Sequence, residues 1–147
     1  MHKIAIGCDP NATDCKIELI KSLEKKGYEV VDFGSDDPIY ANTAFAVGGA
    51  VASGECDRGI LICGTGLGMS MAANKVKGVL AGLVTDPYSA ERARKSNNAK
   101  IACFGAFTQG FRVIEYLANI FLTSEYVEGT PSAPKVQAMF DYDNNRA

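Results

Sequence analysis

The feature that most constrains the fold is an apolar run at residues 59–63 that passes directly into a loop with glycines at positions 64, 66 and 68. An unbroken apolar run of this length is typical of a parallel strand that is buried on both faces. Parallel sheets place ligand sites at the carboxyl ends of their strands, and Cys63 stands at that end. The glycines let backbone N–H groups approach a ligand, and a helix-like segment follows whose N-terminus favours negative charge.

Strand-like and helix-like segments alternate along the chain. Apolar runs predict strands at 3–7, 29–33, 59–63, 79–84 and 101–104, and periodicity and end signals predict helices at 14–26, 43–53, 87–96 and 110–122. Five such units predict a three-layer α/β sandwich, in which helices cover both faces of a five-stranded parallel sheet.

The helix ends carry their own signals. Thr13 is the expected N-cap of the first helix, and Asp86 with Pro87 marks the start of a later one. Residues 1–147 are interpreted as one domain, because no second domain or repeat is visible. Its tail, 130–147, is too thin to fold alone, so we expect it to pack on a partner chain or across its own domain.

Composition excludes several classes of protein. The net charge is −2 without a basic stripe, which argues against a nucleic-acid partner, and no apolar run is long enough to span a membrane. Five cysteines without a C-x-x-C spacing, and no signal peptide, favour reduced thiols in the cytoplasm. The only histidine, His2, lies at the N-terminus, which excludes a histidine-based zinc site and a Ser-His-Asp triad within the chain.

Three loops are expected to meet at the carboxyl edge of the sheet. They are residues 8–11, the loop after Cys63 and residues 96–98, although the last of these can instead face a partner chain. Asp9 and Cys63 both follow central strands, so they can face one pocket. A thiolate, a carboxylate and backbone N–H donors together are suited to moving protons on a carbonyl compound.

Each of these residues has a competing structural interpretation. Cys63 can be a buried, inert residue, as we interpret the other four cysteines, and Asp9 can be a turn residue before Pro10. The glycine loop can also indicate dinucleotide binding, but its G-x-G-x-G spacing after the third strand is a poor match to that motif.

Together these motifs resemble the family of ribose-5-phosphate isomerase B and galactose-6-phosphate isomerase. The resemblance covers residues 3 to about 126, and rests on Asp9 and on the segments 63–69, 73–76, 86–94 and 97–99. It implies a Rossmann-like fold, active sites between the protomers of a dimer, and an aldose–ketose isomerase that needs no metal or nucleotide cofactor.

The resemblance also implies roles for matching residues. Cys63 would be the base that moves a proton between C2 and C1 of the sugar through an enediolate. Thr65 and the backbone of Gly64, Gly66 and Gly68 would hold the developing oxyanion, while Asp9 would bind substrate hydroxyls. The remaining expected substrate contacts are Asn11 beside Asp9, Asn97 reaching into the partner's site, and Lys135 in the tail.

The chain departs from the family at four places. Pro10 and Ser96 stand where the family has histidines, Phe107 stands where a phosphate-binding arginine is expected, and residues 130–135 replace an arginine-rich segment. This pattern looks like the cysteine-bearing B-type subunit of a heteromeric galactose-6-phosphate isomerase.

Three interpretations of function therefore stay open. The chain can be the B-type subunit of an isomerase with a paralogous partner. It can be a homodimer or homotetramer that isomerises an open-chain substrate, such as a tetrose or tetrulose derivative. It can also be a relative that binds sugar phosphates without turnover.

Overall fold

The computed structural model describes residues 2–146 and is built around a five-stranded parallel sheet with the order β2-β1-β3-β5-β4. The strands are β1 (Lys3–Cys8), β2 (Glu29–Asp32), β3 (Arg58–Cys63), β4 (Ala81–Leu83) and β5 (Ile101–Gly105). All five predicted strands are present.

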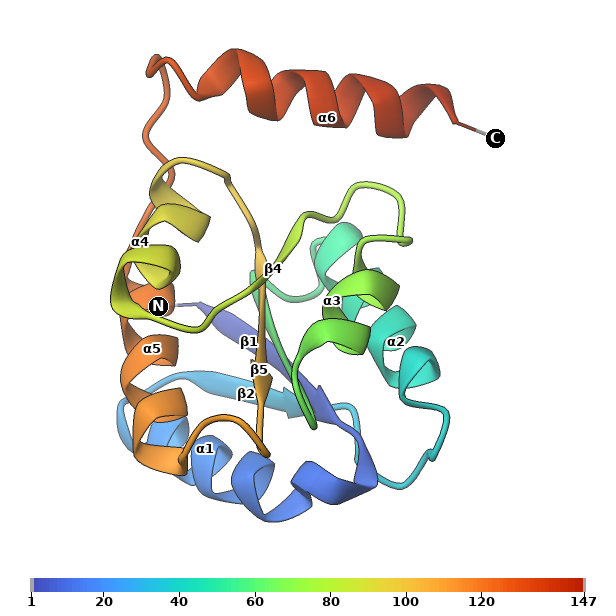
Figure 1. Cartoon of the computed structure of the whole chain (residues 1–147), viewed down its shortest axis with the longest axis vertical. Coiled ribbons are helices and arrows are strands. Elements are labelled where there is room, and N and C mark those ends of the chain that lie inside the picture. The colour runs from blue at the N-terminus through green and yellow to red at the C-terminus, as the bar shows by residue number, and fades with distance from the viewer. Residues whose placement is uncertain (1, 147) are drawn as a thin grey trace.

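Helices cover both faces of this sheet (Figure 1). Their bounds are α1 (Thr13–Lys25), α2 (Tyr40–Ala52), α3 (Leu67–Ala73), α4 (Pro87–Lys95), α5 (Phe111–Thr123) and α6 (Ala133–Asn145), with a short 3-10 turn, η1, at Pro10–Ala12. Helices α2 and α3 lie on one face and α1, α4 and α5 on the other, which confirms the three-layer α/β sandwich.

Strand β3 is buried along its whole length, as its apolar run predicts. Its side chains alternate between the two cores. Ile60 and Ile62 pack with residues of α1, α4 and α5, whereas Leu61 and Cys63 pack with residues of α2 and α3. The thiol of Cys63 is therefore directed to the layer formed by α2 and α3.

The strand order reverses between β1 and β3, and ligand sites of open α/β sheets occur at such a position. Cys8 pairs with Ile62 in the register, and the N–H of Asp9 donates to the carbonyl of Ile62 at 3.1 Å. Asp9 is thus placed beside Cys63 at the carboxyl edge of the sheet, as expected from the sequence.

The prediction of Thr13 as an N-cap is wrong. Pro10 starts the extra turn η1, which Asp9 caps by accepting from the N–H of Asn11 at 2.9 Å. Thr13 is the first residue inside α1, and its hydroxyl donates to the carbonyl of Pro10. The other predicted cap is confirmed, because the N–H of Ser89 donates to Asp86 at 2.8 Å.

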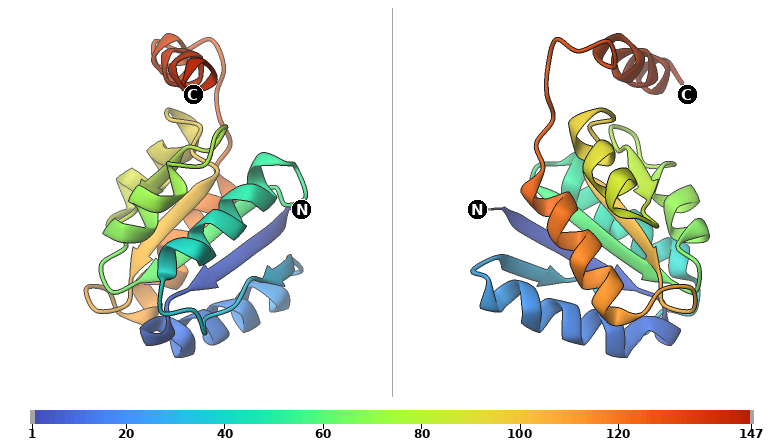
Figure 2. Two further views of the ribbon diagram at one scale, coloured as in Figure 1. Left: turned by 90° about the vertical axis from the view of Figure 1, so that its right-hand side faces the viewer. Right: turned by 60° about the vertical axis from the view of Figure 1, so that its left-hand side comes forward.

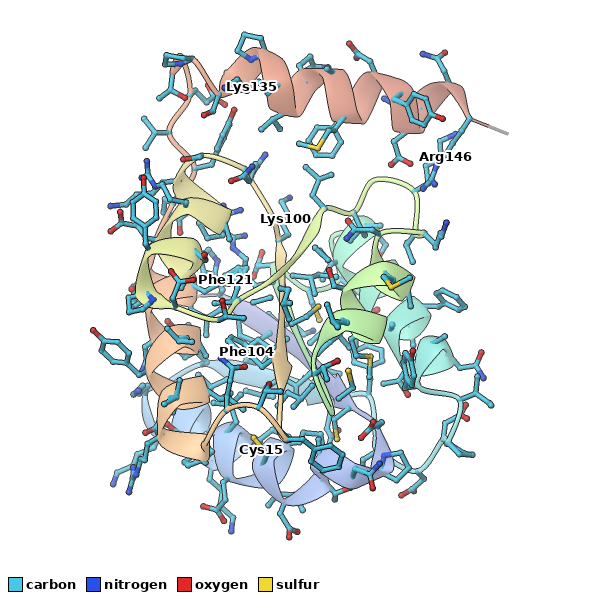
Figure 3. The ribbon with its side chains drawn as sticks, in the orientation of Figure 1. Cys15, Lys100, Phe104, Phe121, Lys135 and Arg146 are labelled. Atoms are coloured by element: carbon cyan, nitrogen blue, oxygen red, sulfur yellow. The ribbon has the colours of Figure 1, made fainter. Side chains whose placement is uncertain are left out.

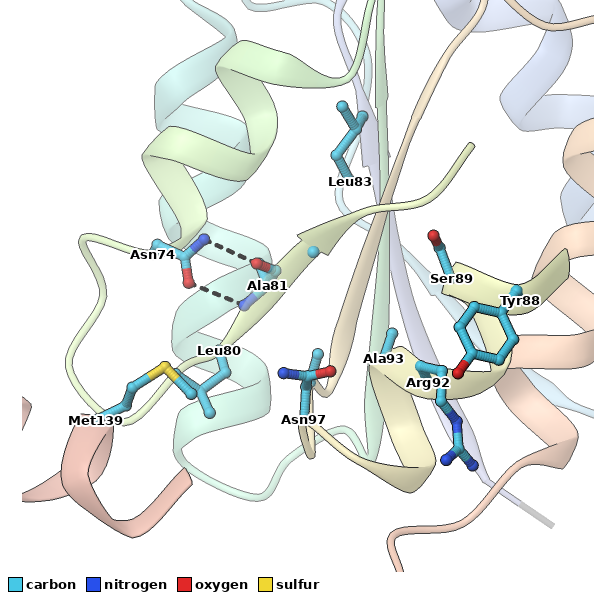
Figure 4. Close-up of a pocket in the computed structure, with 12 residues that line it drawn as sticks. Asn74, Leu80, Ala81, Leu83, Tyr88, Ser89, Arg92, Ala93, Asn97 and Met139 are labelled. Carbon is cyan, nitrogen blue, oxygen red and sulfur yellow. Dashed lines mark hydrogen bonds between the residues drawn. The ribbon is translucent and has the colours of Figure 1, made fainter. Parts of the chain in front are cut away.

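Strand β4 forms one edge of the sheet, and a side chain covers part of that edge. The amide of Asn74 accepts from the N–H of Ala81 at 2.9 Å and donates to the carbonyl of the same residue at 2.8 Å (Figure 4). It thereby occupies the hydrogen-bonding positions that another strand would use.

Helix α6 stands apart from the body of the domain, beyond the amino ends of the strands (Figure 2). Lys135, in its first turn, and Arg146, just after its last residue, are labelled in Figure 3. Contacts with its own chain hold its C-terminal half, since Asp143 accepts from the N–H of Gly78 at 2.5 Å and Arg146 donates to the carbonyl of Lys75. The tail therefore packs in part on its own domain, and its packing on a partner stays a prediction.

Candidate active site

The thiol of Cys63 is fixed at the start of the glycine loop. The side chain is 5% exposed, and its Sγ accepts a hydrogen bond from the N–H of Gly66 at 3.1 Å. The sulfur is consequently held in one position at the base of the loop, where it can approach a ligand that enters from the carboxyl edge.

Gly66 is the residue on which the loop conformation depends. Its φ of 82° lies in the left-handed region, which side-chain-bearing residues rarely adopt. A Cβ at this position would lie 2.5 Å from a methyl group of Leu83 and 3.0 Å from the carbonyl carbon of Phe104. Strain and close packing therefore both require glycine here.

The hydroxyl of Thr65 is oriented by the same loop. Its Oγ1 accepts from the N–H of Leu67 at 3.2 Å, and the side chain is exposed. A hydroxyl that accepts one hydrogen bond can still donate its own proton. Thr65 can therefore offer an O–H to a substrate oxygen, as the family resemblance implies.

Phe107 forms one wall beside the loop. The N–H groups of Ala106 and Phe107 donate to the carbonyls of Cys63 and Gly64 at 2.8 and 2.9 Å. The Phe107 ring, although 71% exposed, packs so closely on Gly64 that a Cβ there would lie 3.0 Å from it. An apolar ring therefore borders the site where the family would place a cation.

Tyr40 forms a second wall that the sequence analysis missed. Its hydroxyl lies over Gly68, so close that a Cβ on the glycine would collide with it. Helix α2 begins at Tyr40, three residues before the predicted start, and the extra turn carries the phenol to the loop. The sequence would have indicated this contact only if the start of α2 had been predicted at Tyr40.

Asp9 is 9% exposed, and a buried cation lies close to its strand end. The ammonium of Lys16, 4% exposed, pairs with Asp32 at 2.8 and 3.0 Å, so its charge is already neutralised. Burial raises the pKa of the neighbouring Cys8 to about 12; Lys16 opposes the rise and Asp9 adds to it. Cys8 is therefore a protonated structural residue.

The other thiols outside the loop behave in the same way. Burial raises the pKa of Cys15, Cys56 and Cys103 above the ordinary range of a cysteine. A raised pKa keeps a thiol protonated and unreactive near neutral pH. This supports the structural interpretation of these three residues and of Cys8.

The third expected loop does not reach this site within one chain. Asn97 follows α4 and precedes β5, which places it at the amino edge of the sheet, opposite to Cys63. It lines a cavity of about 470 Å³ together with Asn74, Leu83 and Met139 (Figure 4). Lys135 lies on α6, also beyond the amino edge (Figure 3).

Of the predicted residues, the structure places Asp9 next in register to Cys63. Asn11 follows in the turn that Asp9 caps, and Thr65 and the glycines follow Cys63 in its own loop. Within residues 2–146, no three His, Cys, Asp or Glu side chains are grouped so that they could hold a metal ion. The same part of the chain contains no helix that is long and apolar enough to cross a membrane.

Comparison with known proteins places this geometry in context. A family model described as Ribose/Galactose Isomerase matches residues 4–139. The chain is 42% identical to the D-erythrulose-4-phosphate isomerase of Pectobacterium atrosepticum over 98% of its length and 97% of that protein. It is 44% identical to the ribose-5-P isomerase B of Listeria innocua, covering 96% of this chain and 97% of that one.

The fold agrees with the sequence comparison. The structure of Clostridium thermocellum ribose-5-phosphate isomerase B superimposes with a TM-score of 0.93 at 38% identity, and 99% of each chain is covered. The sheet, its helices and the tail helix are therefore shared with that protein.

Proposed function

Because this chain belongs to the ribose/galactose isomerase family, we propose that it interconverts the aldose and ketose forms of a sugar phosphate with Cys63 as the base. The observation that carries the proposal is the position of Cys63. Its sulfur is held by the N–H of Gly66 at the carboxyl edge, beside the exposed hydroxyl of Thr65 and next in register to Asp9.

The proposed reaction follows from these groups. The Cys63 thiolate removes the proton from C2 of the open-chain aldose, and the electron pair moves to O1 to give an enediolate. The hydroxyl of Thr65 and the loop N–H groups stabilise the charge on the oxygen. Return of the proton to C1, and transfer of the hydroxyl proton from O2 to O1, give the ketose with no net loss of atoms.

The substrate we propose is a tetrose or tetrulose phosphate. A tetrose esterified at its terminal oxygen has no free hydroxyl with which to close a five-membered ring, so it needs no ring-opening acid or base. Pro10 and Ser96 provide no imidazole, and His2 is bound to Glu125 at 2.9 Å, at the far edge of the sheet. The name of the relative from P. atrosepticum supports a four-carbon substrate for that protein.

We also propose that the active form is a homodimer or a homotetramer. Asn97 and Lys135, both expected at the substrate, lie at the opposite edge from Cys63 in one chain. Leu67 and Met71, on the helix that follows the glycine loop, are 54% and 69% exposed. A second copy that covers this apolar surface can bring its own Asn97 to the loop.

A substrate panel tests the proposed function. The purified homo-oligomer is assayed in D₂O with erythrose 4-phosphate, ribose 5-phosphate and galactose 6-phosphate, and deuterium uptake is followed by NMR. We expect kcat/KM for the tetrose to exceed the value for either cyclic sugar by about 100-fold. A positioned acid or base usually accelerates a proton transfer by at least this factor, and the chain has no such group for opening a ring.

Other outcomes would contradict parts of the proposal. Ordinary enzymatic rates on both cyclic sugars would show that another residue opens the ring. Activity that appears only after addition of a histidine-bearing paralogue would identify the chain as the B-type subunit. Sugar-phosphate binding without deuterium uptake, with or without a paralogue, would identify a non-catalytic relative.

A further inference from the structure

The carboxyl edge of the sheet contains a buried cation that the proposed chemistry does not use. Lys16, near the start of α1, is 4% exposed, and its ammonium donates to both carboxylate oxygens of Asp32 at 2.8 and 3.0 Å. Burying an ammonium is costly unless it is paired, and replacing a buried ion pair by apolar side chains is often no less stable. Stability alone is therefore a poor explanation for this pair.

We propose that Lys16 is a positioning residue that holds Asp9 in place for the substrate. The inference rests on the proposed function, in which Asp9 binds hydroxyl groups of the sugar phosphate. It goes beyond that function because it assigns part of the substrate affinity to a buried residue that acts through other residues. The connection runs from Lys16 through Asp32 and the turn after β2 to the end of β1.

The carboxylate of Asp32 joins Lys16 to the turn that follows β2. Its Oδ1 accepts from the Nζ of Lys16 at 2.8 Å and also from the N–H of Gly34 at 2.8 Å. The carbonyl of Gly34 in turn accepts from the N–H of Cys8 at 3.2 Å. Consecutive hydrogen bonds thus connect the ammonium on α1 to the last residue of β1, which directly precedes Asp9.

Gly34 is the residue in this connection that most needs support. Its φ of 99° lies in the left-handed region, and a Cβ built there would have open space around it among the described residues. Glycine has the widest choice of backbone conformations, so a turn without packing around it depends on its hydrogen bonds. Asp32 supplies the acceptor for the N–H of Gly34, and Lys16 holds Asp32 in the orientation that does so.

Asp9 is fixed from two sides of the sheet. Its own N–H donates to the carbonyl of Ile62 in β3 at 3.1 Å, whereas the preceding residue is held by the turn after β2. Its Oδ1 accepts from the N–H of Asn11 at 2.9 Å, so Oδ2 can accept from a substrate hydroxyl. Loss of the contact on the β2 side would let this carboxylate move relative to Cys63, and a displacement of about 1 Å can cost about 100-fold in activity.

Steady-state kinetics of the intact protein with erythrose 4-phosphate tests the proposal. Lys16→Met removes the ammonium and keeps an unbranched side chain. We expect KM to rise about tenfold while kcat stays within about twofold, because weaker binding of substrate and transition state alike raises KM alone. Asp9→Ala removes the group that Lys16 positions, so adding Lys16→Met to that variant should change KM by less than about twofold.

Asp32→Asn is the second variant, because the side chain of Asp32 is 47% exposed and tolerates a change better than the buried Lys16. Its amide oxygen can still accept from Gly34 but holds the ammonium less strongly, so KM should rise about threefold. The matched control is Arg58→Met, which also removes a buried cation paired with a carboxylate, at the opposite end of a strand. It should lower the melting temperature and leave KM unchanged.

Two results would overturn the proposal. Wild-type KM in Lys16→Met and in Asp32→Asn, despite a lower melting temperature, would limit the pair to a structural role. A full rise in KM when Lys16→Met is added to Asp9→Ala would show that Lys16 acts independently of Asp9. Failure of the proposed function is a different result, since the wild type itself would then turn over none of the sugar phosphates. If it binds them without turnover, the same comparisons are made on Kd by calorimetry.

Discussion

The two edges of the sheet differ in both packing and charge. At the carboxyl edge, Gly66 and Gly68 are approached so closely that a side chain on either would displace its neighbours, and Lys16 is held by Asp32. At the amino edge, cavities remain, and Glu91 lies between Arg92 and Lys95 at 3.7 and 3.4 Å. Under the proposed function, the tightly packed carboxyl edge would hold the base in a fixed position, whereas the more open amino edge leaves room for a partner chain.

The largest expected effect concerns the thiol of the carboxyl edge. Cys63→Ala should lower kcat at least about 10³-fold and abolish deuterium uptake at C2, because the base is lost. Cys63→Ser should be nearly as inactive, since a serine hydroxyl is a much weaker base. The control is Cys56→Ser, which changes another buried cysteine of the same core and should retain activity. An active Cys63→Ala variant would assign the base to another residue.

The next effect tests the close packing of the same edge. Gly66→Ala should lower the free energy of unfolding by about 3 kcal/mol, because it adds a steric collision to the cost of a positive φ. Gly78→Ala is the matched control, since Gly78 also has a positive φ but open space around its Cα, and it should cost only about 1–2 kcal/mol. If urea denaturation shows that the two variants lose the same free energy of unfolding, close packing around Gly66 does not contribute to stability.

A third prediction asks whether the two edges meet across protomers. Asn97→Ala should lower kcat/KM about tenfold, because its amide is expected at the partner's substrate. Mixing this variant with Cys63→Ala and allowing subunits to exchange should restore about a quarter of the wild-type activity, since half of the dimers then contain one complete site. If activity stays at the sum of the two variants despite exchange, the two residues do not act in one site.

The smallest effect concerns the segment that leads to α6. Glu125 pairs with the buried Arg58 at 3.1 Å and with His2 at 2.9 Å, and the hydrogen bond from His2 followed by the charge of Arg58 lowers its pKa. A lowered pKa stabilises the fold above the unfolded value of about 4.5, and this contribution is lost as pH falls through the folded value.

Glu125→Gln should therefore lower the free energy of unfolding at pH 7 by about 1 kcal/mol, a modest value because the carboxylate is 62% exposed and screened by solvent. The difference in melting temperature between variant and wild type should shrink below pH 4.5. A difference that stays constant with pH would mean that the Glu125 carboxylate is not responsible.

The positions of the strands, and of Cys63 at the end of one of them, were predictable from the sequence because local patterns determine them. The unbroken apolar run ending at Cys63 reports burial on both faces, and the glycines after it report a backbone conformation. The edge at which Asn97 lies was also predictable, although the sequence left open whether it contacts a partner chain. A segment that precedes a parallel strand must lie at its amino end, so the chain order already separates Asn97 from Cys63.

Other features depend on contacts between segments distant in sequence. Lys16 reads as an ordinary surface residue of a helix, and only the packing of α1 on β2 brings it to Asp32 and buries it. Tyr40 reaches Gly68 because α2 starts earlier than its small-residue pattern indicates. The cavity between Arg92 and Thr130 forms where the segment after α5 crosses the end of α4, and there the N–H of Val127 donates to the carbonyl of Lys95.

The hydrogen bonds from the side chain of Asn74, at the end of α3, to Ala81 of strand β4 bear on how the protein behaves at high concentration. An exposed edge strand invites the backbone of another molecule to extend the sheet, which is a common route to aggregation. By taking up both the N–H and the carbonyl of Ala81, Asn74 removes one such pairing step from a strand of only three residues. The edge therefore offers a second molecule one fewer place at which to extend the sheet.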